Sequence, residues 1–424
     1  MKVLIDARVL PGVTGGVAVA VKSLVWGLGQ LVDGDEEYIV IVDGDEQRRW
    51  LAPLLGPNQR LAMWPRPSPG LRQRLMLRAF RPVARYMRGV IDRRVWPETP
   101  VSDGFHESLG CDVLHVPTQN FVLCAMPTVY NPHDLQHLHF PQFFTPGVLA
   151  WRETVYRAGC HFAQVVVVGS RWIKEDVVRR YSIDPGKVQV IPEAAPTQND
   201  VEPSAAELER VRTVHRVDPP FVLYPGVTWP HKNHLRLFQA LARLRDERRL
   251  TMRLVCTGAP YPQFWGRIEA GLRELALAGQ VRFLGHLPEA DLRALYRLAT
   301  GLVLPSLYEA SSLPIFEAWL DGLPVACSNA GALPEQVRDA ALLFDGTDVD
   351  AIMAALLAVT QDEERRRVLR ERGYARLKAF DLQRTAKAYR AVYRQAGGFA
   401  LTAEDRWLLQ ADGMPGDLSG PESP

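Results

Sequence analysis

Short runs of consecutive apolar residues, rich in Val, Ile and Leu, recur along the first half of this chain. They lie at Lys2–Asp6, Tyr38–Val42, Asp112–Val116, Thr128–Tyr130, Gln164–Gly169 and Val188–Ile191. Runs that are apolar at successive positions suit strands covered on both faces. Helix-like segments such as Val17–Leu31 and Trp172–Tyr181 lie between them. This alternation predicts a parallel α/β sheet with helical crossovers.

The second half of the chain repeats the pattern. Its apolar runs are Phe221–Tyr224, Met252–Thr257, Val281–Leu284, Gly301–Pro305, Pro324–Ser328 and Ala341–Phe344. Helical patterns separate them at Leu235–Arg245, Glu289–Leu298, Ile315–Asp321 and Asp350–Ala358. A length of 424 residues suits two domains of about 200 residues each. We therefore expect an α/β protein of two Rossmann-like, doubly wound domains that face each other across a deep cleft.

Proline residues mark the boundary between the halves. Pro192, Pro196, Pro203, Pro219 and Pro220 flank a polar stretch that contains one short helix-like piece, Ala205–Val214. We expect an N-terminal domain over 1–195, a linker over 196–218 and a C-terminal domain over 219–380. A terminal helix over 381–396 is expected to pack back on the first domain. The acidic remainder, 397–424, is expected to be largely unstructured.

Composition excludes several classes of protein. A net charge of +2 is too small for the whole chain to bind nucleic acid. No segment reaches the roughly 18 uninterrupted apolar residues of a membrane span. Five cysteines lie far apart in or near apolar runs, which favours a reduced, cytoplasmic setting.

The stretch from Pro305 to Pro324 carries two carboxylates close to a predicted helix start. Glu309 lies in the loop after a strand, and Glu317 lies in the first helical turns, where Pro314 suits the first turn. Backbone N–H groups from about Ser311 to Ile315 could bind a diphosphate, and the carboxylates could hold sugar or ribose hydroxyls. Acidic residues that only complement the helix dipole explain the spacing equally well.

Three other strand-to-helix loops carry candidate residues. Lys232 follows the first strand of the second half and could meet a diphosphate as a point charge, or be a solvated lysine at a helix start. Gly15 and Gly16 precede the first helix and permit close approach of the backbone to a ligand. His133 and Asp134 follow another first-half strand, although a lone histidine is more often structural.

Two other chemistries are not supported by these loops. His137 and His139 lie near His133 and Asp134, but their spacing does not match a standard metal site. A G-x-G-x-x-G sequence after a strand is absent, which argues against a nicotinamide-dependent dehydrogenase.

These motifs together resemble the retaining glycosyltransferases of family 4, which have the GT-B fold, over nearly the whole chain to about Gln395. The resemblance implies that Glu309 contacts hydroxyls of the donor sugar and that Glu317 contacts the ribose. It also implies that Lys232 and the loop of Ser311, Ser312 and Leu313 bind the phosphates.

In the first half, the resemblance implies that the loop of Gly15 and Gly16 closes over the donor phosphate or the acceptor. It places His133, next to Asp134, beside the reacting sugar, where its side chain would hydrogen-bond a donor hydroxyl and the acceptor. We therefore assign catalytic roles to His133, Asp134 and Glu309.

The activity that the resemblance implies is transfer of a hexose from a GDP- or UDP-linked donor, such as mannose or glucose, to a glycan or lipid-linked acceptor in bacterial polysaccharide or glycoconjugate synthesis. It implies retention of configuration, no cofactor and no bound metal. Family members often carry Gly-Phe-Gly after the first Glu, where this chain has Ala310, Ser311 and Ser312. This difference leaves a non-catalytic partner that binds sugar nucleotides as an alternative. A sugar-nucleotide epimerase and a phosphorylase also remain alternatives, because both use related two-domain folds.

An arginine-rich segment over 66–95 contains a single acidic residue, Asp92. On a helix, one stripe would be formed by Arg74, Arg78, Arg81, Arg85 and Arg88. We hypothesise peripheral contact with anionic lipid at the inner face of the plasma membrane, or guidance of a phosphate-bearing acceptor. A solvated helical face packed over the first domain is the alternative.

Overall fold

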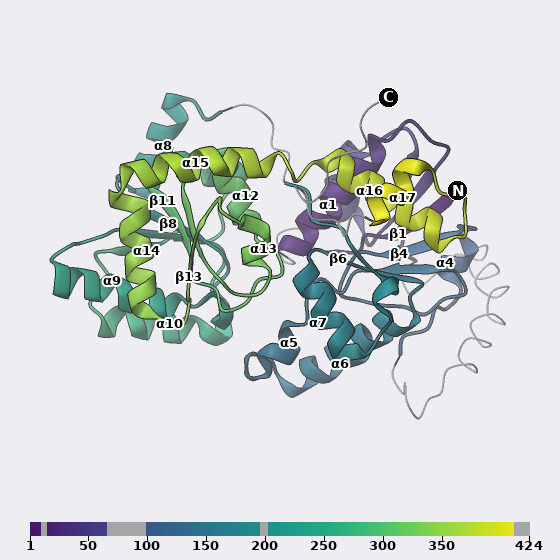
Figure 1. Cartoon of the computed structure of the whole chain (residues 1–424), viewed down its shortest axis with the longest axis horizontal. Helices are drawn as coiled ribbons and strands as arrows, with labels where there is room; N and C mark the ends of the chain where they lie inside the picture. The colour runs from purple at the N-terminus through teal and green to yellow at the C-terminus, as the bar shows by residue number, and fades with distance from the viewer. Residues whose placement is uncertain (10–14, 66–98, 196–201, 411–424) are drawn as a thin grey trace. The chain divides into compact units, whose positions relative to one another are not determined.

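The computed structural model describes most of the chain, namely residues 1–9, 15–65, 99–195 and 202–410. These residues form two compact units (Figure 1). Unit 1 is Met1–Ala194 together with the segment that starts at Phe380, and unit 2 is Ala195–Ala379. The arginine stripe predicted within 66–95 lies outside the described residues. In the described part, no helix combines the length and the apolar composition needed to cross a membrane.

Unit 1 is built on a seven-stranded parallel sheet with the order β3-β2-β1-β4-β5-β6-β7. The strands are β1 Lys2–Asp6, β2 Glu37–Val42, β3 Gln59–Met63, β4 Val113–Val116, β5 Thr128–Tyr130, β6 Val165–Val168 and β7 Val188–Val190. Every apolar run of the first half forms a strand. The sequence did not predict β3, because this edge strand has only partly buried side chains and a weak apolar pattern.

Helices cover this sheet. They are α1 Gly16–Gly29, α2 Asp45–Leu51, α4 Phe105–Ser108, α5 Gln136–His139, α6 Pro146–Phe162, α7 Arg171–Tyr181, α16 Leu382–Ala396 and α17 Ala403–Gln410. The C-terminal helix α16 packs on α1 so closely that a Cβ atom at Gly27 would lie 3.1 Å from side-chain atoms of Ala386 and Leu382. A segment from the end of the chain is therefore part of the core of unit 1.

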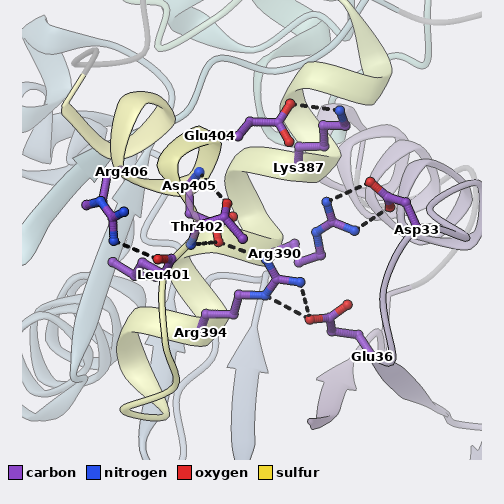
Figure 2. A network of polar contacts seen from close by, with 10 residues as sticks. All are labelled: Asp33, Glu36, Lys387, Arg390, Arg394, Leu401, Thr402, Glu404, Asp405 and Arg406. Carbon is purple, nitrogen blue, oxygen red and sulfur yellow. Dashed lines mark hydrogen bonds and ion pairs between the residues drawn. The ribbon is translucent and has the colours of Figure 1, made fainter.

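The expectation that 397–424 is largely unstructured is wrong for its first part, because α17 packs against α16 (Figure 2). The guanidinium of Arg394 on α16 lies 2.6 Å from Glu36 and 2.7 Å from Asp405 on α17. Leu408 of α17 is buried in the apolar core of the unit. Ion pairing and burial thus order a segment that looks polar by composition. Residues 411–424 lie outside the described part.

Unit 2 is built on a six-stranded parallel sheet with the order β10-β9-β8-β11-β12-β13. Its strands are β8 Val222–Pro225, β9 Leu254–Thr257, β10 Val281–Phe283, β11 Gly301–Leu304, β12 Val325–Ser328 and β13 Leu342–Phe344. Its helices are α8 Ala205–His215, α9 His234–Arg248, α10 Pro262–Glu274, α11 Glu289–Leu298, α12 Leu313–Leu320, α13 Leu333–Val337, α14 Val349–Gln361 and α15 Glu363–Leu377. Both units are doubly wound parallel sheets, which confirms the predicted α/β class.

Part of the segment predicted as a linker, 196–218, is a helix of unit 2. Helix α8 packs against α11, where Asp291 accepts hydrogen bonds from Arg210 and, at 2.7 Å, from His215. These contacts fix α8 to the body of unit 2. Residues 196–201 are outside the described part of the chain.

Candidate functional site

Two predicted donor-binding side chains meet in unit 2. Strands β8 and β11 are neighbours, and the chain continues from β8 toward one edge of the sheet and from β11 toward the other. Doubly wound sheets bind ligands at the carboxyl ends of strands where the order reverses in this way. Lys232 lies in the loop after β8 and Glu309 in the loop after β11, and Lys232 Nζ is 2.6 Å from Glu309 Oε1.

Backbone and side-chain hydrogen bonds tie these two loops together. The N–H of Leu307 donates to the carbonyl of His231 at 2.7 Å. Asn233 donates from Nδ2 to the carbonyl of Pro305 at 2.8 Å. Asn233 has a φ of 62°, a left-handed conformation that Asn tolerates better than most residues. Lys232 is thus held between two residues that are bonded or anchored to the β11 loop.

The contact between Lys232 and Glu309 is largely shielded from water, because the two side chains are 19% and 9% exposed. An ammonium group has three N–H donors, so Lys232 can bond a phosphate while it keeps Glu309. A carboxylate has several acceptor sites, so Glu309 can also accept a hydroxyl. The pair can therefore bind a phosphate and a nearby hydroxyl of one ligand.

The loop that follows Glu309 offers fewer backbone donors than the sequence predicts. Helix α12 starts at Leu313 with Pro314 in its first turn, as expected. However, the N–H of Ser312 donates to Gln336 Oε1 at 2.9 Å, and the N–H of Ile315 donates to the carbonyl of Ser312 at 3.2 Å. The prediction that the N–H groups of Ser312 and Ile315 are free is therefore wrong. Within the described chain, the N–H groups of Ser311 and Leu313 have no acceptor and stay candidate donors.

Glu317 lies on α12 and is bonded to the neighbouring helix α11. Its Oε2 accepts a hydrogen bond from the hydroxyl of Tyr296 at 2.5 Å. Burial raises the pKa of Glu317 above its usual value, although the bond from Tyr296 acts in the opposite direction. The contact fixes the side chain and leaves its second oxygen, Oε1, to accept a ligand hydroxyl.

The backbone of Glu309 rests on the segment between β12 and α13. The N–H of Ala332 donates to the carbonyl of Glu309 at 2.9 Å. Gly331 has a φ of 60°, and a Cβ atom there would lie 2.2 Å from the carbonyl oxygen of Glu309. Sequence analysis did not identify Gly331, although it lies only three residues after the apolar run Pro324–Ser328, in a strand-to-helix loop.

Replacing Gly331 with Ala should lower both stability and any activity that depends on Glu309. A left-handed φ costs a non-glycine residue about 1–2 kcal/mol, and the clash with Glu309 adds to this. Urea denaturation gives the stability change. The matched control is Gly266→Ala on the exposed side of α10, where no atom lies within 4 Å of the new Cβ and a small stabilisation is expected. Equal stability of Gly331→Ala and wild type would contradict the close approach.

His133 lies in unit 1, in the loop between β5 and α5. Its φ is 63°, an uncommon conformation that often occurs at functional sites. Its Nε2 lies 3.0 Å from the carbonyl of Pro117, which can only accept, so Nε2 carries a hydrogen. Nδ1 lies 3.9 Å from Glu193 Oε1. Asp134 accepts the N–H of Gln136 at 3.0 Å, which gives it a local role at the start of α5.

The two neighbouring histidines have other partners. His137 lies 3.5 Å from Glu153, and Nε2 of His139 lies 2.7 Å from Asp176. Among the residues described, no group of three or more His, Cys, Asp or Glu side chains is arranged to hold a metal ion.

A buried hydrogen-bond chain supports the His133 loop. The hydroxyl of Tyr393 donates to His115 Nδ1 at 2.7 Å, His115 Nε2 donates to Asn131 Oδ1 at 2.8 Å, and Asn131 Nδ2 donates to the hydroxyl of Tyr389 at 2.8 Å. Burial lowers the pKa of His115 to about 3, so this histidine is neutral and these directions are consistent. Helix α16 thus fixes Asn131, two residues before His133.

Gly15 and Gly16 lie at the start of α1 in unit 1. Gly15 has a φ of 57°, a conformation that glycine adopts more readily than other residues. The structure therefore brings together Lys232 and Glu309 in unit 2, with Ser311, Ser312, Leu313 and Glu317 on the same loop and helix. Gly15, Gly16, His133 and Asp134 are residues of unit 1.

Comparison with known proteins agrees with these features. The protein-family model described as Glycosyltransferase Family 4 matches residues 14–199. The family model described as Glycosyl transferases group 1 matches residues 206–376. The O-antigen chain mannosyltransferase B of Escherichia coli is 32% identical over 268 residues, which cover 61% of this chain and 69% of that protein. An MMP alpha-(1->4)-mannosyltransferase of Mycolicibacterium hassiacum is 28% identical over 305 residues, 69% of each chain.

Among solved structures, HepE of Anabaena in complex with UDP and glucose is similar in fold. The TM-score is 0.67 over 93% of this chain and 100% of that chain, with 16% sequence identity. The family models, the related mannosyltransferases and the shared fold agree, and this chain belongs to glycosyltransferase family 4, with the GT-B fold.

Proposed function

We propose that this protein transfers a hexose from a nucleoside-diphosphate sugar to a glycan or lipid-linked acceptor, with retention of the anomeric configuration. The observation that carries the proposal is the contact of Lys232 with Glu309, 2.6 Å apart where the strand order of unit 2 reverses. A donor of this kind presents a diphosphate next to a sugar ring, and a cation beside a carboxylate matches that combination.

The residues of unit 2 have complementary roles in this reaction. The bond between the anomeric carbon and the phosphate oxygen breaks, and negative charge develops on the leaving nucleoside diphosphate. Lys232 and the N–H groups of Ser311 and Leu313 would stabilise that charge, helped by the positive end of the α12 dipole. Glu309 would hold a sugar hydroxyl and Glu317 a ribose hydroxyl. The acceptor oxygen bonds to the anomeric carbon from the face that the phosphate leaves, and its proton passes to the phosphate oxygen.

We assign acceptor binding to unit 1. There, His133 would present Nδ1 to a hydroxyl of the acceptor or sugar, and the loop of Gly15 and Gly16 would approach the ligand closely. The donor that we propose is GDP- or UDP-linked mannose or glucose, used in polysaccharide or glycoconjugate synthesis. The names of the related mannosyltransferases support mannose, and the complex of HepE with UDP and glucose supports a UDP-linked glucose. Transfer should need no metal and persist in EDTA. Contact of the arginine segment 66–95 with anionic membranes remains a proposal from sequence.

A thermal-shift screen with UDP, GDP and their mannose and glucose derivatives tests this function. A ligand at about 100 times its Kd stabilises the folded state by about 2.7 kcal/mol, so a matching donor should raise the melting temperature by several degrees. No shift with any of these compounds would contradict the proposal. Product analysis then follows with and without a panel of acceptors. An altered sugar nucleotide formed without acceptor would indicate an epimerase, and donor binding without hydrolysis or transfer would indicate a non-catalytic partner.

A further inference from the structure

The side chain of Gln336, on α13, makes two hydrogen bonds with the backbone of Ser312. The N–H of Ser312 donates to Oε1 at 2.9 Å, and Nε2 donates to the carbonyl of Ser312 at 3.0 Å. Both residues are almost fully buried, with exposed fractions of 5% and 3%. A carboxamide offers a donor and an acceptor side by side, which neither an ionised carboxylate nor an apolar side chain can do. The two bonds to Ser312 therefore require a side-chain amide at position 336.

The same short segment also holds the other end of the loop. The N–H of Ala332 donates to the carbonyl of Glu309 at 2.9 Å, so Glu309 and Ser312 are both bonded to the segment that ends at Gln336. Arg376, which is 8% exposed, donates from α15 to the carbonyl of Gln336 at 3.0 Å and to that of the preceding residue at 3.1 Å. The loop is thus fixed at both ends to a segment that is itself fixed to α15.

The bonds to Gln336 also select which backbone donors remain at the start of α12. Ser312 is extended, with φ −131° and ψ 101°. In extended backbone, successive N–H groups point in opposite directions. Because the N–H of Ser312 points to Gln336, the N–H of Leu313 is turned away from Gln336.

We propose that Gln336 is a positioning residue for the donor loop, defined as Glu309–Leu313. It holds the loop backbone in place before the ligand binds. The N–H of Ser312 is bonded to Gln336, and the N–H of Leu313 is available to a nucleoside diphosphate. This inference rests on the proposed function, because it requires the loop to bind the donor. Backbone N–H groups that are already in place lose less conformational freedom when the ligand binds than N–H groups that must first be ordered.

The substitution Gln336→Met tests the role, because it keeps the volume of the side chain and removes both hydrogen bonds. Isothermal titration calorimetry with UDP and GDP should show about a tenfold loss of affinity for the diphosphate that the wild type binds. The affinity for the matching nucleoside, uridine or guanosine, measured by saturation-transfer NMR, should stay unchanged because a nucleoside has no phosphate. The matched control Gln263→Met, at an exposed position at the start of α10, should bind both ligands as the wild type does.

Unchanged affinity of Gln336→Met for the diphosphate would overturn the proposal, as would an equal loss for nucleoside and diphosphate, which indicates general damage to the fold. If Gln336→Met does not fold, Gln336→Asn replaces it, because its shorter amide cannot reach both groups of Ser312, and the same selective loss is expected. The wild-type titration alone tests the proposed function. A wild type that binds neither UDP nor GDP would refute that function, whereas normal wild-type binding with an unaffected variant would refute only the role of Gln336.

Discussion

Replacing Glu309 with Gln should reduce sugar transfer about 100-fold while the protein stays folded. Glutamine preserves the shape of the side chain but removes the charge that pairs with Lys232 at 2.6 Å. A hydrogen bond that involves a charged group contributes about 1.5–3 kcal/mol, so loss of a charged contact to the donor sugar in the transition state corresponds to roughly 10- to 200-fold in rate. The measurement is kcat/KM with the donor found in the thermal-shift screen, together with the melting temperature.

A double-mutant cycle with Lys232→Met shows whether the two residues act together. Both side chains are mostly buried and in direct contact, so the losses in kcat/KM should not add. Lys232→Met should lower kcat/KM much less in the Glu309→Gln variant than in the wild type. The control Glu371→Gln changes an exposed carboxylate on α15 and should leave transfer unchanged. Full activity in Glu309→Gln would refute the assignment of this carboxylate to the donor site.

Most strands of the two sheets could be predicted because parallel strands inside a sheet are buried on both faces and so carry runs of apolar residues. Val165–Val168, for example, is a run of four valines whose positions are all buried, so a continuous apolar pattern and a central strand coincide. The edge strand Gln59–Met63 escaped prediction because only one neighbour pairs with it and water reaches its side chains. The edge strands β10 and β13 are also partly exposed, but they were predicted because they keep mostly apolar residues, whereas β3 begins with Gln59 and Arg60.

Part of the candidate site could also be predicted from sequence. Lys232 and Glu309 both follow apolar runs, and the carboxyl ends of neighbouring parallel strands lie together, so their proximity follows once the strand order is known. The contacts that fix the loops around these residues cannot be recognised from any pattern in the sequence. Gln336 bonds to a residue 24 positions earlier, and His115 bonds to Tyr393 across 278 positions. Single polar residues at such separations give no periodic signal.

Order near the end of the chain could not be predicted from composition either. Its acidic residues, with glycine and proline beyond them, suggested disorder, yet Asp405 is only 2% exposed and lies against Arg394. Composition counts charges, whereas order in this segment depends on whether each charge has a partner. Here the partner is supplied by α16, which was itself predicted as a helix.

Replacing Arg394 with Met should destabilise unit 1 by about 3–5 kcal/mol, because two carboxylates would lose their shared cation. Arg394 donates to Glu36 at 2.6 Å and to Asp405 at 2.7 Å, and these acidic residues are 8% and 2% exposed (Figure 2). Removal of one partner from a buried ion pair leaves uncompensated charge in a poorly solvated place. Urea denaturation measures the stability, and hydrogen exchange of the α17 amides shows whether this helix separates first.

The pH dependence of this effect distinguishes lost charge from lost packing. Burial alone would raise the pKa of Asp405, but hydrogen bonds from Thr402 and Arg394 hold it below its usual value of 3.8. In the wild type, Asp405 therefore stabilises the fold at neutral pH, and this contribution is lost as pH falls below 3.8. Without Arg394 the carboxyl is more easily protonated in the folded state, so the stability difference between variant and wild type should narrow as pH is lowered from 7 toward 3.8. A difference that is independent of pH would indicate lost packing. The control Arg406→Met, at an exposed residue of α17 that bonds only to the carbonyl of Leu401 in Figure 2, should change stability by less than about 0.5 kcal/mol.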